Sequence, residues 1–212
     1  MKVLVTAGPT REPIDLIRFL SNRSTGKMGF ALADQAVQRG HVVKLIAGPV
    51  SLDTPRGVDR QDVETTKEML EAVRFAVPWC DALIMAAAVS DWRPAAIHPG
   101  KMKKRNAVLD IPLERTEDIL MEIAPLKGGR LFVGFAAEAE NIEDEARRKV
   151  REKGLDLIVA NDVTESDAAF EAETNRVTLF DGKGEVKKFP LASKQDVASC
   201  LMQCIEERLY AL

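Results

Sequence analysis

The chain has 212 residues, 46% of them hydrophobic and 30% charged, with a formal net charge of -3, and this composition predicts a single globular domain over residues 1–212. The weakly acidic balance gives no electrostatic reason to expect nucleic acid as a partner. Because the sequence has neither an apolar run of membrane-spanning length nor the layout of a signal peptide, we expect no membrane association and a cytoplasmic location.

The beginning of the chain alternates short apolar strands with a helical pattern. Residues 2–7, KVLVTA, are rich in β-branched side chains and end at Gly8, which is typical of a buried strand followed by a turn. Residues 29–40 have apolar side chains at helical spacing, and residues 41–49 form the next apolar strand. A strand, a helix and a strand in this order predict a parallel βαβ unit with a right-handed crossover.

The same alternation continues along the chain. Further helices are predicted near 65–77, 117–126 and 142–153, and further strands at 82–89, 130–138 and 155–162. Five such strands predict an α/β fold, a Rossmann-like doubly wound parallel sheet. Residues 107–113 and the hairpin pattern of 176–190 interrupt the alternation, and we expect them to form a small β extension.

A closing helix is predicted at 193–210, and it carries two of the three cysteines. The chain has an odd number of cysteines, namely Cys80, Cys200 and Cys204, and only two histidines. These numbers support neither a disulfide framework nor a zinc site. We therefore expect the three cysteines to be buried thiols.

The connection at 8–25 is far longer than a strand-to-helix loop usually is, and long loops in compact domains are usually functional or disordered. It carries Asp15, Arg18 and Asn22, so ligand contact is the favoured interpretation, with a short surface helix at 13–20 as the alternative.

The end of this loop, SNRSTGKMGF at 21–30, differs from a nucleoside-triphosphate P-loop at two positions. Ser21 replaces its first glycine, and Met28 replaces its last hydroxyl residue. A polar, glycine-containing segment that leads into an apolar helix still predicts an anion site, because the amides and the positive end of the helix dipole attract negative charge.

Other polar groups follow the ends of later strands, and ligands of an open parallel sheet bind beyond those ends. Three alanines at 86–88 precede Asp91, and a basic cluster at 101–105 follows; the alternative for this cluster is a solvated surface patch. Phe135 either stacks on a ligand ring or belongs to the core. Lys149 and Lys153 lie one helical turn apart, where they either reach a phosphate or form solvated helix surface.

Six segments together resemble one family. TAGPTREPID, SNRSTGKMG, AAAVSDWRP, KMKK, GFAAE and ANDV occur in order over nearly the whole chain, and they are similar to the motifs of phosphopantothenoylcysteine synthetases, ligases of coenzyme A biosynthesis. The resemblance implies that 4'-phosphopantothenate, L-cysteine and CTP with Mg²⁺ react through an acyl-cytidylate to give phosphopantothenoylcysteine, CMP and pyrophosphate. It also implies a homodimer, with its interface at the β extension. A flavoprotein decarboxylase is fused to this domain in many bacteria, so the chain corresponds either to a stand-alone synthetase or to that domain.

The resemblance also assigns roles to residues. Asn22 is the candidate for stabilising the acyl phosphate and the oxyanion that forms during attack by cysteine, and Lys101 is the candidate for neutralising the nucleotide phosphates. Asn22 and Ala87 correspond to substrate-binding positions. The positions that correspond to nucleotide contacts are Gly8, Ser24, Gly26, Lys27, Asp91, Lys101, Glu117, Asp118, Ile119, Leu120, Phe135, Lys149 and Lys153.

The sequence departs from the family at the segment expected to meet the base. The family commonly has Asn-Pro-Asp where this chain has Thr116, Glu117 and Asp118. The choice between CTP and the ATP that eukaryotic-type members use therefore stays open. The magnesium ligands are also left open by the sequence. A nicotinamide-dependent dehydrogenase is disfavoured, because the G-x-G-x-x-G fingerprint is missing after the first strand. A non-catalytic nucleotide-binding protein is the remaining alternative, and the presence of Asn22, Asp91 and Lys101 argues against it.

Overall fold

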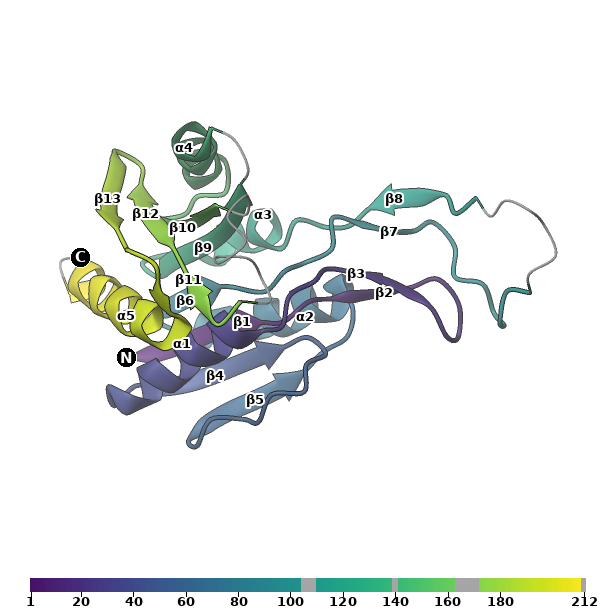
Figure 1. The fold of residues 1–212 in the computed structure, drawn as a ribbon, viewed down its shortest axis with the longest axis horizontal. Coiled ribbons are helices and arrows are strands. Elements are labelled where there is room, and N and C mark those ends of the chain that lie inside the picture. The colour runs from purple at the N-terminus through teal and green to yellow at the C-terminus, as the bar shows by residue number, and fades with distance from the viewer. Residues whose placement is uncertain (104–109, 139–140, 163–171, 211–212) are drawn as a thin grey trace.

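The computed structural model describes residues 1–103, 110–138, 141–162 and 172–210, and its centre is one sheet of eight strands (Figure 1). The sheet has the order β13-β12-β10-β9-β6-β1-β4-β5. Its strands are β1 (Lys2–Ala7), β4 (Val42–Ala47), β5 (Val58–Asp62), β6 (Ala82–Met85), β9 (Leu131–Glu138), β10 (Leu157–Asp162), β12 (Val177–Asp181) and β13 (Gly184–Lys188). The run from β10 to β5 pairs in parallel, whereas β12 and β13 are antiparallel to their neighbours. The predicted Rossmann-like doubly wound sheet is confirmed.

Helices cover both faces of this sheet. One face carries α1 (Lys27–Gln38) and α5 (Lys194–Tyr210), and the other carries α2 (Thr66–Ala76), α3 (Ile119–Ile123) and α4 (Ile142–Glu152). Two short 3₁₀ helices, η1 (Val77–Trp79) and η2 (Ala124–Leu126), follow α2 and α3. Along β1 the side chains alternate between the two apolar cores, with Val3 and Val5 on the α1 side and Leu4 on the α2 side. Because both faces are buried, the central strands are almost continuously apolar.

The five predicted parallel strands are present, and β5 is a sixth that the sequence did not reveal. Its sequence, VDRQD, is mostly polar because it lies at the edge of the sheet, where only β4 pairs with it. The chain order of the parallel strands reverses between β1 and β6, since β4 and β5 follow β1 on one side while β9 and β10 follow β6 on the other. This is the switch point where open α/β sheets bind ligands.

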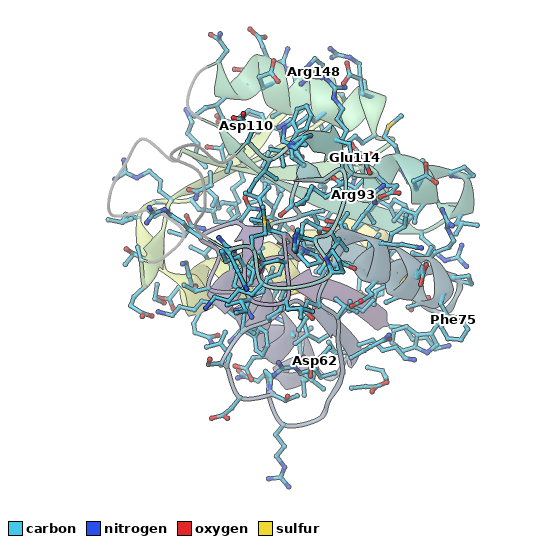
Figure 2. All side chains as sticks on the ribbon, turned by 90° about the vertical axis from the view of Figure 1, so that its right-hand side faces the viewer. Asp62, Phe75, Arg93, Asp110, Glu114 and Arg148 are labelled. Atoms are coloured by element: carbon cyan, nitrogen blue, oxygen red, sulfur yellow. The ribbon has the colours of Figure 1, made fainter. Side chains whose placement is uncertain are left out.

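Two small ribbons extend from the sheet side by side and form what we call the arm (Figure 1). The first pairs β2 (Arg11–Pro13) with β3 (Phe19–Ser21), and the second pairs β7 (Trp92–Pro94) with β8 (Leu113–Arg115). Arg93 and Glu114, labelled in Figure 2, form an ion pair of 2.9 Å across the second ribbon. The alternative of a surface helix at 13–20 is wrong, because Asp15 turns the chain by accepting hydrogen bonds from the N–H groups of Ile17 and Arg18, both at 2.8 Å.

The hairpin predicted at 176–190 is confirmed, and it belongs to the main sheet instead of a separate extension. The hairpin of 176–190 forms β12 and β13 and continues the main sheet beside β10. Within the other segment, 107–109 lie outside the described residues, and Leu113 begins β8 of the arm. The hairpin joined the main sheet because its backbone pairs with the open edge of β10. Residues 113–115 joined the arm because their backbone pairs with residues 92–94. A further short pair, β11 (Thr174–Asn175) and β14 (Ala192–Ser193), lies before α5.

The cysteines are buried only in part. Cys80 is buried and Cys204 is half-buried, but Cys200 is exposed, so the prediction of three buried thiols is wrong at that position. On α5, Val197 and Leu201 face the core, and Cys200 lies to one side of that stripe. No helix in the described parts of the chain is both long and apolar enough to span a membrane.

Candidate functional site

A cavity of about 800 Å³ lies at the carboxyl edge of the sheet, at the switch point between β1 and β6. The start of α1, the loop after β6, the segment before α3, the ends of β9 and β10, and helix α4 all contribute to it. All but two of the site residues that the sequence predicted line this cavity, namely Asn22, Ser24, Gly26, Lys27, Ala87, Asp91, Glu117, Asp118, Ile119, Leu120, Phe135, Lys149 and Lys153. The fold therefore brings together segments that are far apart in the sequence.

The start of α1 forms one wall of the cavity. Gly26 precedes the helix with φ 79°, and no side chain caps the helix at this residue. Gly29 lets α1 approach β1 closely, because a Cβ atom at this position would lie 2.5 Å from the Cβ of Ala7. The positive end of the helix is thus held directly at the end of β1 and faces the cavity, where it would attract an anion.

Gly8 does not line the cavity but supports this wall. It has φ 77°, and a Cβ atom on Gly26 would lie 3.4 Å from its Cα atom. Val50 contacts both positions, since a Cβ on either glycine would meet its Cγ1 at 3.0 Å. A side chain at Gly8 would be strained by the backbone conformation and would push against Val50.

The loop after β6 forms the next wall. The predicted strand 82–89 ends at Met85, because the chain then leaves the sheet and passes along the cavity. Asn22 holds this loop: its Nδ2 donates to the carbonyl oxygen of Ala88 at 2.9 Å. The N–H of Ala87 donates to Oγ1 of Thr6 at 3.2 Å. The predicted substrate-binding pair, Asn22 and Ala87, therefore belongs to one hydrogen-bonded unit.

The opposite side of the cavity is built around α3 and α4. Asp118 caps α3 by accepting a hydrogen bond from the N–H of Met121 at 3.2 Å, and it pairs with Nζ of Lys153 at 2.9 Å. Lys149 and Lys153 are both half-buried and line the cavity. Phe135, at the end of β9, is half-buried and lines the cavity, and it packs against the core on the α1 and α5 side of the sheet.

A buried polar network joins the arm to the sheet beside this cavity. Glu12 is 4% exposed, and its Oε1 accepts hydrogen bonds from the N–H of Thr66 at 2.8 Å and from the Oγ1 of Thr66 at 2.7 Å. Thr10 Oγ1 lies 3.1 Å from Oγ1 of Thr66 and accepts from the N–H of Ser90 at 2.9 Å. The network fixes β2, α2 and the loop after β6 relative to one another, because each buried polar group depends on its partner.

Lys101 does not line the cavity. It is exposed and lies in the connection between β7 and β8, in a segment held by the turn between β2 and β3. The N–H of Met102 donates to Oδ2 of Asp15 at 3.1 Å, and Nη2 of Arg18 donates to the carbonyl oxygen of Met102 at 2.9 Å. Lys104 and Arg105 of the same basic cluster lie outside the described residues.

Other residues line the cavity without having been predicted for the site. Among them are Trp92, Arg115, Asn175 and Lys194. Trp92 and Arg115 stack on each other across the second ribbon, with the guanidinium 5.7 Å from the ring centroid. The sequence held one indication for Lys194. A lysine in the first turn of a helix is unfavourable next to the positive end of the helix dipole, so its presence there suggests another role.

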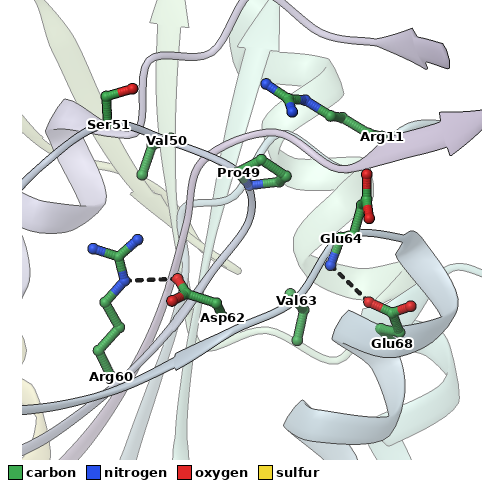
Figure 3. Close-up of a pocket in the computed structure, with 9 residues that line it drawn as sticks. All are labelled: Arg11, Pro49, Val50, Ser51, Arg60, Asp62, Val63, Glu64 and Glu68. Carbon is green, nitrogen blue, oxygen red and sulfur yellow. Dashed lines mark hydrogen bonds and ion pairs between the residues drawn. The ribbon is translucent and has the colours of Figure 1, made fainter. Parts of the chain in front are cut away.

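A second, more open cavity of about 610 Å³ lies beside β5 and the base of β2 (Figure 3). Its charges serve the local structure: Nε of Arg60 donates to Asp62 at 2.7 Å, and a carboxylate oxygen of Glu68 accepts from the N–H of Glu64 at 2.7 Å. None of the residues predicted for the site lines it.

The described residues contain no cluster of three or more His, Cys, Asp or Glu side chains that would hold a metal ion by themselves. Mg²⁺ is commonly held by one or two carboxylates together with substrate phosphates. Asp91, which lines the cavity, fits that mode of binding.

The chain is similar in sequence to proteins of one known family. Residues 1–209 match the family described as the DNA/pantothenate metabolism flavoprotein C-terminal domain. The chain is 48% identical over 202 residues to the coenzyme A biosynthesis bifunctional protein CoaBC of Bacillus subtilis, with 95% of this chain and 50% of the relative covered. It is 44% identical to the protein of that name in Escherichia coli K12, with 98% of this chain and 52% of the relative covered. The chain thus spans about half the length of these relatives.

Solved structures have the same fold. The crystal structure of the C-terminal domain of a coenzyme A biosynthesis bifunctional protein CoaBC is 41% identical, with a TM-score of 0.85, and the match covers 100% of this chain and 96% of that one. A Cab2 mutant in complex with phosphopantothenate-cysteine shares the fold at 15% identity, with a TM-score of 0.78 over 99% of this chain and 86% of that one. On the family match, the identities and the fold, the chain belongs to the DNA/pantothenate metabolism flavoprotein C-terminal domain family.

Proposed function

We propose that the chain is a phosphopantothenate-cysteine ligase, which joins 4'-phosphopantothenate to L-cysteine with CTP. One observation carries this proposal: segments from distant parts of the sequence, each resembling a motif of that ligase family, meet around one cavity at the switch point of the sheet. The names of the relatives, which refer to coenzyme A biosynthesis and to bifunctional proteins, support it.

The reaction would proceed in two displacements. The carboxylate of 4'-phosphopantothenate attacks the α-phosphorus of CTP and pyrophosphate leaves, which gives an acyl-cytidylate. The amine of cysteine then attacks the acyl carbon, the bond to CMP breaks, and the amide forms with loss of a proton. Neither displacement needs a nucleophile from the protein, so catalysis rests on positioning the reactants and on stabilising charge.

The walls of the cavity match these needs. The start of α1, with Ser24, Gly26 and Lys27, would receive the phosphates. Lys153 would contact the nucleoside from the end of α4, and Phe135 would contact it from the end of β9. Bound Mg²⁺ would reduce the negative charge of the triphosphate, and its ligands would be mainly phosphate oxygens, with Asp91 within the same cavity.

Asn22 is the residue we assign to the acyl phosphate. Its amide nitrogen carries two N–H groups, and one of them donates to Ala88 in the loop after β6. Turned towards the reacting group, this amide would donate to the oxyanion that forms when cysteine attacks. A neutral donor suits this task because it stabilises the oxyanion of the transition state without binding the substrate carboxylate more tightly in the ground state.

The proposed function also includes a homodimer that forms through the arm. Leu16, Ile17, Phe19, Trp92 and Leu113 are exposed apolar residues, and all lie on the two ribbons or on the turn of the first. Exposed apolar side chains gathered on one projection indicate an interface. A pair of arms would also explain the place of Lys101, which lies in the connection between β7 and β8 and does not line the cavity of its own chain. Light scattering after gel filtration distinguishes a dimer from a monomer.

We further propose that the domain works with a phosphopantothenoylcysteine decarboxylase flavoprotein, either fused to it or as a partner. The descriptions of the family as a flavoprotein domain and of the relatives as bifunctional support this.

One experiment tests the activity. The purified protein is incubated with 4'-phosphopantothenate, cysteine, Mg²⁺ and each of the four nucleoside triphosphates in turn, and pyrophosphate and phosphopantothenoylcysteine are measured. We expect both products with CTP and little of either with the others. Formation of both products with ATP would reassign the nucleotide, and absence of the amide product with every nucleotide would overturn the proposed function.

A further inference from the structure

Lys194 is a buried cation that lines the cavity and lies outside the family motifs. It is the first residue of α5, it is 7% exposed, and it lines the cavity. Its Nζ donates a hydrogen bond to the carbonyl oxygen of Ala172. Burial lowers the pKa of Lys194, and the nearby positive charge of Lys27 lowers it further. A buried ammonium next to a second ammonium is costly unless negative charge is also present.

One negative charge beside these two lysines is that of Glu173. Its carboxylate forms an ion pair with Nζ of Lys27. The pKa of Glu173 is lowered, first by the hydrogen bond from Lys27 and also by the charge of Lys194. Glu173 thus lies beside two cations that line the cavity, although it does not line the cavity itself.

Glu173 differs from the lysines in its exposure. Its side chain is 82% exposed, whereas that of Lys27 is 31% exposed. An ion pair with so exposed a partner contributes little to the stability of the fold. A ligand with several negative charges would therefore displace this carboxylate easily, because it would attract both lysines more strongly than a single carboxylate does.

We infer that Lys194 and Lys27 together bind the terminal phosphates of the nucleotide, and that Glu173 is a resident carboxylate which competes with those phosphates. This inference rests on the proposed function, since it assigns residues to the triphosphate end of the same site. It makes two predictions of opposite sign. Loss of the Lys194 charge weakens triphosphate binding, and loss of the Glu173 charge strengthens it.

The test is calorimetric titration of the full chain with two probes, CTP with Mg²⁺ and CMP. For Lys194→Met we expect CTP affinity to fall by about tenfold or more, the effect of losing one well-placed charge contact, while CMP affinity changes by less than about twofold. Lys194→Arg keeps the charge and should recover most of the CTP affinity. The matched control is Lys188→Met, which removes an exposed lysine of β13 and should change neither affinity.

The second arm of the test uses Glu173. Glu173→Gln should raise CTP affinity by about two- to tenfold, because the competing charge is removed. The increase should disappear when Lys27 is also replaced by Met, since the carboxylate then has no ion pair to give up. Glu185→Gln, at another exposed ion pair, is the control and should leave CTP affinity unchanged.

The outcomes separate the two proposals. If the wild-type chain binds no CTP, the proposed function fails and this inference fails with it. If the wild-type chain binds CTP but Lys194→Met binds it equally well, or Glu173→Gln binds it no more tightly, the inference alone is overturned. If circular dichroism shows that Lys194→Met does not fold, the test rests on Glu173→Gln, measured alone and in combination with Lys27→Met.

Discussion

The carboxylate of Asp15 and the backbone N–H of Met102, which are 87 residues apart in the sequence, are joined by a hydrogen bond of 3.1 Å. The side chain of Asp15 is fully buried, and it also accepts hydrogen bonds from Nε and Nη2 of Arg18. One carboxylate thereby attaches the segment that carries Lys101 to the turn of the first ribbon. The position of the expected nucleotide lysine depends on this contact.

Replacing Asp15 should therefore loosen the arm. We expect Asp15→Asn to lower the melting temperature and to reduce ligase activity by about tenfold or more, because an amide cannot accept all the hydrogen bonds that the carboxylate accepts. The exposed control Asp53→Asn should change neither property.

The effect of Asp15 on stability should also depend on pH. The hydrogen bond from Arg18 holds the pKa of Asp15 well below its ordinary value of 3.8. A carboxyl group with a depressed pKa in the folded state stabilises the fold above its ordinary pKa and loses that effect as the pH falls below it. The difference in melting temperature between wild type and Asp15→Asn should thus be constant near neutral pH and shrink below about pH 4. A difference that stays constant down to pH 2.5 or so would contradict this account.

Lys101→Gln should block the first half-reaction. Removing the cation that neutralises the phosphates should reduce pyrophosphate release by about 10²-fold or more. Normal release by this variant, measured without cysteine in a single turnover, would refute the role. Lys67→Gln, at an exposed position on α2, is the control.

If Lys101 acts in the cavity of the second copy in a dimer, two inactive variants should complement each other. Mixed dimers of Lys101→Gln and Asn22→Ala chains would contain one cavity with both residues intact. Mixing the two inactive variants should then restore part of the activity, whereas no recovery in demonstrably mixed dimers would assign Lys101 to its own chain.

Asn22→Ala should affect the second half-reaction. We expect pyrophosphate release to continue while transfer to cysteine falls by about 10²- to 10³-fold, the usual loss when one oxyanion donor is removed. The acyl-cytidylate should then accumulate and be detectable by mass spectrometry of the quenched reaction. Equal losses in both half-reactions would indicate that Asn22 acts in binding instead, through its contact with Ala88.

Gly29→Ala should destabilise the protein even though alanine favours helices. Helix propensity alone would stabilise α1 by about 1 kcal/mol. The added Cβ would lie 2.5 Å from the Cβ of Ala7 and 2.9 Å from the carbonyl oxygen of Thr6, and such overpacking costs about 1–3 kcal/mol. Denaturant unfolding measures the net effect. Gly129→Ala is the control, since nothing lies within 4 Å of a Cβ atom at that position.

The cysteines should react with iodoacetamide in a fixed order. Cys200 is exposed and should be modified first. Burial raises the pKa of the Cys80 thiol to about 11, and burial also raises the pKa of Cys204. Because the thiolate is the reactive form, Cys80 should be modified last, and only at the rate of unfolding. Peptide mass spectrometry over time follows each site, and early modification of Cys80 would contradict its burial.

The sequence by itself determined the layered fold and most of the candidate site. Buried parallel strands need continuous apolar runs such as residues 2–7, and the helices between them need apolar residues at helical spacing, so both can be recognised locally. The site residues at the ends of β1, β6 and β9 then follow from topology, because parallel strands end at one edge of a sheet.

Only the tertiary structure decided the arm, the edge strands and the place of Lys101. The sequence of β5 is polar because one side of the strand has no partner. The segment between β2 and β3 forms a turn through the carboxylate of Asp15, and that carboxylate also binds the distant N–H of Met102. Lys194 meets Lys27 and Glu173 only after α5 packs beside α1. Such features depend on contacts between residues far apart in the chain, and no local pattern of side chains records them.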